Sequence, residues 1–457
     1  MTIARASSFH TRLEMTAESL APVIGSWPEP ALLVSAPGFG GAGRWSIYAA
    51  RPRIVFEATG SSWRVRSSMG NERGEGNFLE RLDGLLHQFG LAGRSEPLEP
   101  AAPPFQGGMI GFFGYDLAPS LECLPRKAER DSRLPDIRFA LYDTAITYDH
   151  ETGSVELWAH DLLHEGERAT GKRFRKWLRA LKQAAPATPA RSRLGPVESN
   201  FSRDHYLAAV QRALDYIAAG DVFQVNLSQR FCARGKPVPL DLFLRLQARS
   251  PAPFSAFLAW DDLAVVSASP EWFYQTRGRR IITRPIKGTR PRGADPYEDE
   301  RLAAELRTSD KDRAELVMIV DLERNDLGRV CQYGSVQVLE PGAVESFAQV
   351  HHLVATVEGQ LRRGVGPLDI VRAVFPGGSI TGAPKIRAMQ IIDELEPTRR
   401  SLYTGSIGYF SRGRSSAFNI AIRTLLVEGD RVSFQVGGGI VADSRPESEY
   451  AETLHKG

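Results

Sequence analysis

The chain has 457 residues, of which 42% are hydrophobic and 24% are charged, and its formal net charge is +3. These values are ordinary for a globular protein and exclude a disordered or fibrous one. The length suffices for one very large domain or for two closely packed domains. Because the net charge is small and the positive residues are scattered, we expect no nucleic-acid partner.

The cysteines and the N-terminal residues indicate the compartment. Cys123, Cys232 and Cys331 are far apart and form no CxxC pair, which argues against a disulfide scaffold or a structural zinc site and fits a reducing cytosol. Polar residues interrupt residues 1–30, so this stretch has neither a signal-peptide nor a membrane-spanning pattern. We therefore predict a cytoplasmic protein with no membrane partner.

One composition change divides the chain. Residues 183–200 are rich in Ala, Pro, Arg and Ser and have no sustained period, which indicates a linker. We place the linker at 186–200, between an N-terminal region at 1–185 and a second region at 201–457. The N-terminal region is predicted to contain a helix at 168–182 and several strands. Those strands are Arg53–Glu57, Met109–Phe113 and Ser154–Ala159.

The local signals become stronger after the linker. Ser202 is a good N-cap for an amphipathic helix that runs to Ala219, and Val222–Phe231 then has the pattern of a strand. Turns at 413–414 and 429–430 separate apolar runs, which predicts a β-meander over residues 405–441. Grouped strands with helices between the groups favour an α+β fold over a regularly alternating α/β barrel.

A lysine directly after a β-branched run is a candidate nucleophile. The strand pattern Ile281–Thr283 ends just before Pro285–Thr289, a loop that contains Lys287. An amine attacks only when it is deprotonated, so a catalytic Lys287 must be desolvated or lie near other positive charge. The alternative is an ordinary solvated surface lysine.

Two acidic helix starts provide candidate metal ligands. Residues 309–312 have the form of a capping box, and Asp312 and Glu315 lie three residues apart on one helix face. Residues 444–447 repeat that form before a helix that carries Glu449, Glu452 and Lys456 in one stripe. Ligands that are all oxygen suit Mg²⁺. The alternative is that these acids only complement the helix dipole.

Glycine clusters are the third element of a candidate site. Gly437, Gly438 and Gly439 end the last strand, where backbone N–H groups can approach a carboxylate closely. Residues 375–385 form a loop that opens a helix, a place that attracts anions, although the spacing is not that of a Walker motif. The alternative for both clusters is a tight turn without further function.

Arg423 and the pair His351–His352 complete the candidates. Arg423, within a strand pattern over Phe418–Thr424, is able to hold a carboxylate in bidentate geometry, or is a surface residue of an edge strand. Adjacent residues on a strand point in opposite directions, so at most one of the two histidines faces a site. Together these residues describe a site for a polyanionic small molecule held with Mg²⁺.

The motifs from Ser202 to Lys456 resemble those of the chorismate-utilising enzymes of the anthranilate synthase component I family. A looser match extends to Gly43–Ile47, and the related enzymes continue past the position of Gly457 for part of another helix. The matching motifs are Gly220–Asn226 (GDVFQVN), Ser269–Glu271 (SPE), Pro285–Thr289 (PIKGT), Asp312–Glu315 (DRAE), Asp321–Arg329 (DLERNDLGR), residues 377–385 (GGSITGAPK) and residues 437–444 (GGGIVADS).

This resemblance implies a fold, a substrate and site residues. The fold is two large antiparallel-rich β-sheets packed orthogonally with helices around them, the substrate is chorismate and the cofactor is Mg²⁺. Glu315 and Glu452 would ligate the metal directly, supported by Asp312 and Glu449 through water. The implied residues for the substrate carboxylates are Tyr403, Arg423, the backbone of Gly437, Gly438 and Gly439, and Lys456. The implied catalytic residues are Lys287, Thr289 of the same motif, His352 beside the ring, and Glu271 as the acid that assists loss of the 4-hydroxyl.

Lys287 separates members of the family. The resemblance implies that members with Lys here aminate chorismate at C4 to 4-amino-4-deoxychorismate, the first step toward para-aminobenzoate and folate, whereas anthranilate- and isochorismate-forming members have Ala. The ammonia would come from a separate glutamine amidotransferase subunit, because the chain has no nucleophile-elbow Cys with partner His and Glu. An anthranilate-forming enzyme and an inactive ligand-binding relative are the alternatives. We find no counterpart of the inhibitor-binding motif of feedback-regulated members, so tryptophan binding stays open.

Overall fold

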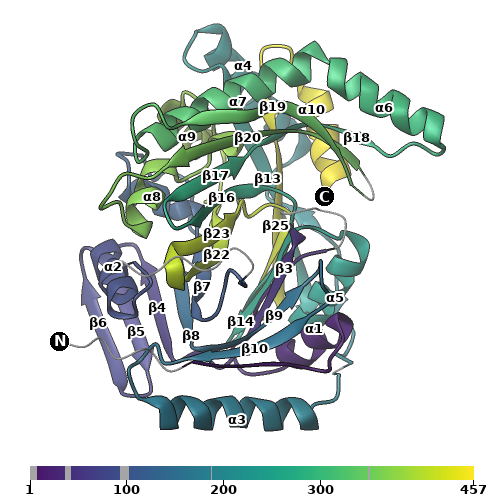
Figure 1. The fold of residues 1–457 in the computed structure, drawn as a ribbon. Coiled ribbons are helices and arrows are strands. Elements are labelled where there is room, and N and C mark those ends of the chain that lie inside the picture. Colours follow the sequence, from purple (N-terminus) through teal and green to yellow (C-terminus); the bar gives the residue numbers. More distant parts are fainter. Residues whose placement is uncertain (1–7, 37–42, 93–101, 187, 348–349) are drawn as a thin grey trace.

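The computed structural model describes residues 8–36, 43–92, 102–186, 188–347 and 350–457, and these form two large β-sheets with helices around them (Figure 1). Every strand pairing between the named strands of the described residues is antiparallel. This confirms the predicted α+β fold. Within these residues, no helix is long and apolar enough to cross a membrane.

The first sheet, sheet A, has β13 near one end. Its strands in spatial order are β1 (Ser8–Arg12), β10 (Val155–His160), β9 (Thr144–Asp149), β3 (Trp45–Ala49), β2 (Ala31–Val34), β14 (Phe254–Trp260), β15 (Leu263–Ser269), β24 (Thr424–Glu428), β25 (Arg431–Ile440), β13 (Gln224–Lys236) and β11 (Arg193–Leu194). Two further short strands, β12 (Glu198–Ser199) and β21 (Gly382–Ala383), also pair with β13.

The second sheet, sheet B, begins at the strand that carries Lys287. Its strands in spatial order are β18 (Ile286–Pro291), β20 (Val350–Gln360), β17 (Arg280–Arg284), β16 (Trp272–Arg277), β23 (Ser415–Asn419), β22 (Ser406–Ser411), β7 (Gly108–Phe113), β8 (Ile137–Tyr142), β4 (Ile54–Thr59), β5 (Ser62–Ser67) and β6 (Gly70–Glu75). β19 (Gln337–Ser346) pairs with β20.

The predicted β-meander over residues 405–441 is wrong as a single unit. Its first hairpin, β22–β23, belongs to sheet B, and its second hairpin, β24–β25, belongs to sheet A. Residues 420–423 connect the two sheets, so Arg423 lies between strands and not within one. Its φ of 49° is a left-handed conformation that breaks the strand pattern at this residue. The apolar periodicity of these strands is the same whether the two hairpins share one sheet or belong to two sheets, because each strand buries apolar side chains in either case.

The two sheets face each other across an apolar core. Ile47 and Ala256 from sheet A meet Ile110, Phe112 and Ile407 from sheet B, all nearly inaccessible to solvent. The alternation of inward and outward side chains along each strand supplies this layer. Strands from both sides of residues 186–200 share each sheet, since β2 pairs with β14 and β7 pairs with β22.

Helices cover the outer faces of the sheets (Figure 1). Those that pack on sheet A are α1 (Ala17–Gly25), α3 (Glu167–Gln183) and α5 (Pro239–Arg249). Around sheet B lie α2 (Phe78–Gln88), α6 (Pro296–Thr308), α7 (Asp310–Gly328) and α8 (Pro367–Val374), and around β13 and β25 lie α4 (Arg203–Ala218), α9 (Lys385–Leu395) and α10 (Pro446–Lys456). Three short 3₁₀ segments are η2 (Tyr115–Ser120), η3 (Gly378–Ile380) and η4 (Arg412–Arg414).

The helix starts test the capping predictions. Ser202 and Ser309 each accept a hydrogen bond from a backbone N–H of the first turn, of His205 and Asp312, as the sequence predicts. The predicted cap at Ser444 is wrong, because its hydroxyl accepts from the Val441 N–H and Arg445 is the N-cap of α10. Pro446 in the first turn fixes the helix start instead.

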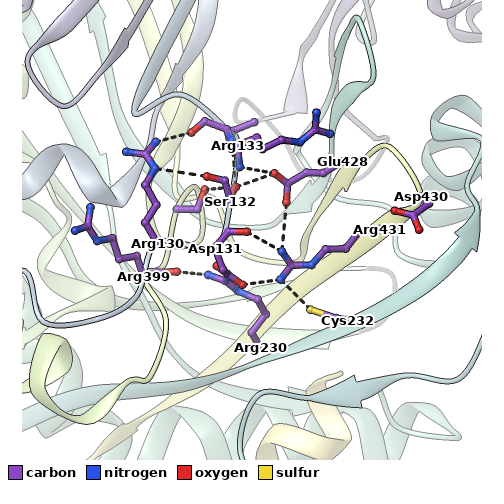
Figure 2. A network of polar contacts seen from close by, with 12 residues as sticks. Arg130, Asp131, Ser132, Arg133, Arg230, Cys232, Arg399, Glu428, Asp430 and Arg431 are labelled. Atoms are coloured by element: carbon purple, nitrogen blue, oxygen red, sulfur yellow. Dashed lines mark hydrogen bonds and ion pairs between the residues drawn. The ribbon is translucent and has the colours of Figure 1, made fainter.

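A network of arginines fastens residues 130–133 to sheet A (Figure 2). The Asp131 carboxylate lies between Arg230 of β13 and Arg431 of β25, and Arg431 Nη2 is 2.7 Å from Asp131 Oδ2. Arg230 is only 3% exposed and also donates to the Arg399 carbonyl. Although burial opposes it, the two guanidinium groups lower the pKa of Asp131. The segment before β8 is thereby fixed to two strands that follow about 100 and 300 positions later in the chain.

We expect Asp131→Ala to lower the free energy of unfolding by about 2–4 kcal/mol, because it leaves the buried Arg230 guanidinium without a counter-charge. Asp430→Ala is the matched control. Its ion pair with Arg234 is solvent-exposed, so the loss should stay below about 1 kcal/mol. Urea unfolding of both variants measures the difference, and equal losses would contradict the role of Asp131.

Candidate active site

A cavity of about 650 Å³ lies where β18, β25 and α10 approach one another. Both sheets contribute to its wall, together with the segment that joins β23 to β24. The predicted site residues that line it are Glu271, Lys287, Tyr403, Arg423, Gly437, Gly438, Gly439 and Lys456. Glu271 and Lys456, which are 185 positions apart in the sequence, therefore line the same half-open cavity.

Lys287 is half-buried in this cavity, on β18 and not in a loop. The motif was expected to follow the end of a strand, but it forms a new strand with an irregular register between Lys287 and Thr289. Gly288 has a φ of 72°, and a Cβ there would come within 2.8 Å of the Asp312 Cγ. A glycine in this conformation is typical of a bulge that redirects a neighbouring side chain.

Burial sets the charge state of the Lys287 amine. Desolvation lowers its pKa, because the ammonium form loses its hydration. The carboxylates of Glu315 and Glu271 oppose this effect, and the positive charge of Lys456 adds to it. The cavity therefore favours a neutral, nucleophilic amine more than bulk water does.

Glu271 lies directly before β16 and is 8% exposed. Ser379 of η3 donates a hydrogen bond to Glu271 Oε1 over 2.5 Å. Burial raises the pKa of Glu271, while Ser379 and Lys287 oppose the shift. A protonated carboxyl is what a general acid needs. The GGSITGAPK motif contains Ser379, but the sequence shows no link between this hydroxyl and Glu271.

Two large side chains, Tyr403 and Arg423, also line the cavity. Tyr403 is 7% exposed, and the Arg400 guanidinium lies 5.5 Å from the centre of its ring. Arg423 makes no side-chain hydrogen bond or ion pair with the residues that the structure describes, and burial lowers its pKa. Because guanidinium stays protonated in proteins, Arg423 presents an unpaired positive charge to the cavity.

The glycine run of β25 gives α10 room to approach. β25 pairs with β24 only as far as Phe434, whereas its pairing with β13 continues through Gly439. A Cβ on Gly438 would lie 3.2 Å from Glu449 Oε2 and 3.6 Å from Glu452 Oε1. Because these glycines have no side chains, the carboxylates of Glu449 and Glu452 can lie close to the same edge of β25 that lines the cavity.

The four predicted metal ligands form two pairs. On α10, Glu452 is ion-paired with Lys456 at 2.5 Å, and burial together with the Glu452 charge raises the pKa of Glu449. On α7, Asp312 accepts a hydrogen bond from Arg290 over 3.1 Å. Within the described ranges, no three His, Cys, Asp or Glu side chains are close enough together to hold a metal ion. The two pairs therefore do not meet as one ligand set.

His352 and Thr289 lie outside the main cavity. Thr289 Oγ1 is 2.9 Å from His352 Nδ1, across the β18–β20 pairing. His352 lines a neighbouring cavity of about 30 Å³, and Ile286 lines both spaces. Burial and the positive charge of Arg423 lower the pKa of His352 to about 4, so the imidazole is neutral. As expected for adjacent strand residues, His351 has different partners, Ser346 and Asp299.

Glu323 is a half-buried acid that the sequence does not single out. It lies two turns after Glu315 on α7, and its Oε2 is 2.8 Å from Thr283 Oγ1. The Thr283 hydroxyl is also 2.6 Å from the Phe273 carbonyl, and one hydroxyl has one proton to donate. If that proton goes to the carbonyl, Glu323 is the donor and is protonated. Burial raises the pKa of Glu323 to about 8, in agreement with this geometry.

Comparisons with known proteins identify the family. Residues 46–457 match the model of the family described as chorismate binding enzyme. The chain is 46% identical to aminodeoxychorismate synthase component 1 of Escherichia coli over 90% of this chain and 88% of the relative. It is 45% identical to anthranilate synthase component 1 of Thermus thermophilus over 79% of this chain and 78% of the relative. The crystal structure of anthranilate synthase component I from Streptococcus pneumoniae superposes with a TM-score of 0.81 at 32% identity, covering 92% of each chain. The chain belongs to the chorismate-binding enzyme family.

We expect Glu323→Gln to remove a pH dependence of stability. The pKa of Glu323 is near 4.5 when unfolded and about 8 when folded, so its proton stabilises the fold below the first value and is lost as pH rises through the second. Relative to the variant, the wild type should lose about 4 kcal/mol of unfolding free energy between pH ~4.5 and pH ~8.5. Urea unfolding at several pH values measures this. Parallel curves for the two proteins would contradict a protonated Glu323.

Proposed function

We propose that this enzyme aminates chorismate at C4 to give 4-amino-4-deoxychorismate, the activity that the name of the Escherichia coli relative implies. Sequence identity does not distinguish this from anthranilate formation, because both kinds of relative match at similar levels. The observation that carries the proposal is Lys287, an amine whose pKa is lowered by burial in the same cavity as the acid Glu271.

Charge complementarity supports chorismate as the substrate. Chorismate has two carboxylates, and the cavity presents the unpaired guanidinium of Arg423 and the ammonium of Lys456. Lys456 Nζ donates to the Gly437 carbonyl over 3.2 Å, which places this charge at the glycine edge of β25. Arg423 and the Lys456–glycine edge are the elements that we assign to the two carboxylates. The hydroxyl of Tyr403 adds a polar group to the same wall.

The first displacement uses Lys287 and Glu271. The neutral Lys287 amine forms a bond to C2, the ring double bond shifts, and the C4–O bond breaks. Glu271 gives its proton to the departing oxygen, which leaves as water, so Glu271 becomes a carboxylate. The lysine nitrogen carries the positive charge of the covalent intermediate. The opposite pKa shifts of Lys287 and Glu271 favour the starting states that this step needs.

The second displacement restores both residues. Ammonia forms a bond to C4, the double bond shifts back, and the bond between C2 and the Lys287 nitrogen breaks. The new C4 ammonium gives one proton to the Glu271 carboxylate, which returns to its acid form. Chorismate and ammonia thereby yield the C4 amine and water. Two displacements retain the configuration at C4.

The acidic pairs suit Mg²⁺. We assign Glu315 and Glu452 as direct ligands and Asp312 and Glu449 as supporting groups, because all four are oxygen donors and both glutamates act on the charge of Lys287. The two pairs do not meet as one ligand set in this structure, so a bound Mg²⁺ would have to draw α7 and α10 together. Burial and, to a smaller degree, the negative charge of Glu452 raise the pKa of Glu449, and a bound cation would stabilise its carboxylate form. A bound Mg²⁺ supplies positive charge for a substrate carboxylate.

We infer that a glutamine amidotransferase subunit supplies the ammonia. The relatives are named as component 1, which fits an enzyme that works with a second component. Free ammonium salts at alkaline pH replace such a subunit in the test that follows.

Product analysis tests the function. The purified chain is incubated with chorismate, Mg²⁺ and ammonium, and the products are separated by mass and absorbance. The proposal expects 4-amino-4-deoxychorismate, which an added lyase converts to para-aminobenzoate. Anthranilate with pyruvate would overturn the assignment of Lys287 and keep the fold and the cavity. No turnover of chorismate would favour a ligand-binding relative.

Lys287→Ala should reduce formation of the C4 amine by about 10²-fold or more, because no nucleophile remains to start the first displacement. Lys172→Ala, on the exposed side of α3, is the matched control and should leave the rate unchanged. The rate is measured with the coupled lyase, and mass spectrometry of the quenched wild type should detect a chorismate-derived adduct on Lys287. Undiminished output from Lys287→Ala would sink the covalent role.

Glu452→Gln should raise the Mg²⁺ concentration for half-maximal activity by about tenfold or more, because a neutral amide is a poorer ligand than a carboxylate. Glu447→Gln on the same helix is the control, since its side chain faces solvent. A magnesium titration at saturating chorismate measures the shift. An unchanged requirement in Glu452→Gln would remove this residue from the ligand set.

A further inference from the structure

Lys456, at the end of α10, engages one of the two carboxylates that we assign as direct metal ligands. Its Nζ lies 2.5 Å from Glu452 Oε1, four residues earlier on the same helix. The other assigned ligand, Glu315 on α7, has no side-chain hydrogen bond or ion pair with the residues that the structure describes. Lys456 is therefore the contact that a cation must break before both glutamates can bind it.

The pair between Lys456 and Glu452 is able to open. About half of each side chain is exposed, at 48% and 49%. Exposed ion pairs of this kind are weak, because water and salt screen the attraction between the two charges. The pair therefore holds Glu452 without fixing it.

The other acidic pair has a more firmly held basic partner. Arg290 Nη2 is 3.1 Å from Asp312 Oδ2, and Arg290 Nε is 2.8 Å from Glu305 Oε1. The Arg290 and Asp312 side chains are only 25% and 16% exposed. Two carboxylates thus hold Arg290 in place, and Asp312 is in any case a supporting group. The exchange that matters for a direct ligand is the one at Lys456.

The ammonium of Lys456 and a metal ion compete for Glu452. Both are cations, and both would use the lone pairs of Oε1, so each disfavours the other through repulsion. An ammonium that leaves this oxygen makes the carboxylate a better ligand for Mg²⁺.

Lys456 is already placed to bind the substrate instead. It lines the main cavity together with Gly437, Gly438 and Gly439, and its Nζ donates to the Gly437 carbonyl over 3.2 Å. An ammonium has three N–H donors, and Glu452 and Gly437 use two of them. A carboxylate that binds at the glycine edge therefore competes with Glu452 for the same ammonium, and Lys456 need not leave that edge to exchange one for the other.

We propose that Lys456 neutralises Glu452 until chorismate binds, and that it then pairs with a substrate carboxylate and frees Glu452 for Mg²⁺. Chorismate and Mg²⁺ thereby strengthen each other's binding, and thermodynamic linkage makes the effect equal in both directions. This inference rests on the proposed function, which assigns Glu452 to the metal and Lys456 to the substrate.

Isothermal titration calorimetry with Mg²⁺ and no chorismate tests the competition. Lys456→Met removes the ammonium and should lower the Kd for Mg²⁺ about two- to fivefold, whereas Lys456→Arg keeps the charge and should not lower it. Lys311→Met is the matched control. Lys311 is exposed and acts on the charge of Glu449, but it forms no ion pair with the described residues, so the Kd should stay within about 1.5-fold. An unchanged or higher Kd in Lys456→Met, or an equal fall in Lys311→Met, would overturn the inference.

The coupling is measured in Lys287→Ala, which has no nucleophile and leaves chorismate unreacted. Saturating chorismate should lower the Kd for Mg²⁺ by about fivefold or more. In the double variant with Lys456→Met, this factor should be about two- to fivefold smaller, because the competing ammonium is then absent with and without chorismate. Equal factors in the two proteins would contradict the exchange.

Calorimetry also separates this inference from the proposed function, because it measures binding without turnover. If Glu452→Gln weakens Mg²⁺ binding and Lys456→Met does not strengthen it, only the inference about Lys456 fails. If Glu452→Gln binds Mg²⁺ as tightly as the wild type, the metal assignment of the proposed function fails, and the exchange at Lys456 fails with it. Anthranilate as the product would overturn amination at C4 and leave the calorimetric result unaffected.

Discussion

The buried ion pair between Arg400 and Glu396 holds the walls of the cavity together. Both side chains are almost inaccessible to solvent, and Arg400 Nη2 is 2.7 Å from Glu396 Oε1. Arg400 also donates to the carbonyls of Ile380 and Asn226, and Glu396 accepts from the Ser228 N–H and hydroxyl. One charged pair thereby fixes the glycine loop, strand β13 and helix α9 relative to one another. A buried pair contributes little net stability, so its value here is the single arrangement that it selects.

This arrangement places an amine and a carboxyl in one cavity that shifts the pKa of each toward its uncharged form. Burial lowers the pKa of Lys287 and raises that of Glu271, because in each case it disfavours the charged form. In open solvent, the same two residues would form an ordinary ion pair, with a protonated amine and an ionised acid. The chemistry thus depends on the burial of Lys287 and Glu271 as much as on the identity of these residues. Because its guanidinium stays protonated, Arg423 supplies a positive charge that attracts an anionic substrate.

The sequence predicted the α+β fold class and the helices capped by Ser202 and Ser309, because periodicity and capping are local properties. Lys287, Glu271 and the glycines of β25 were also predicted to share one site, because the resemblance to a known family carries information on contacts between distant residues. It failed where two arrangements satisfy the same local pattern. Apolar and polar residues alternate in the hairpins over residues 405–441 in the same way whether the hairpins share a sheet or not. Ser444 is a residue type that commonly caps helices, but its hydroxyl accepts a hydrogen bond from the Val441 N–H instead. Ser379 and Glu323 were missed because their partners, Glu271 and Thr283, come from segments far away in the sequence.

The division of those hairpins is also what creates the site. If β22 to β25 formed one meander, residues 420–423 would be an ordinary turn and Arg423 would face a sheet neighbour. Because the chain instead passes from sheet B to sheet A at this point, Arg423 adopts a left-handed conformation between the sheets and lines the cavity. β25 then extends beyond β24, which leaves the edge of Gly437–Gly439 open to the substrate and to α10. The segment at residues 420–423, which the sequence predicted to lie within a single meander, is therefore the one whose crossing between the sheets opens the cavity.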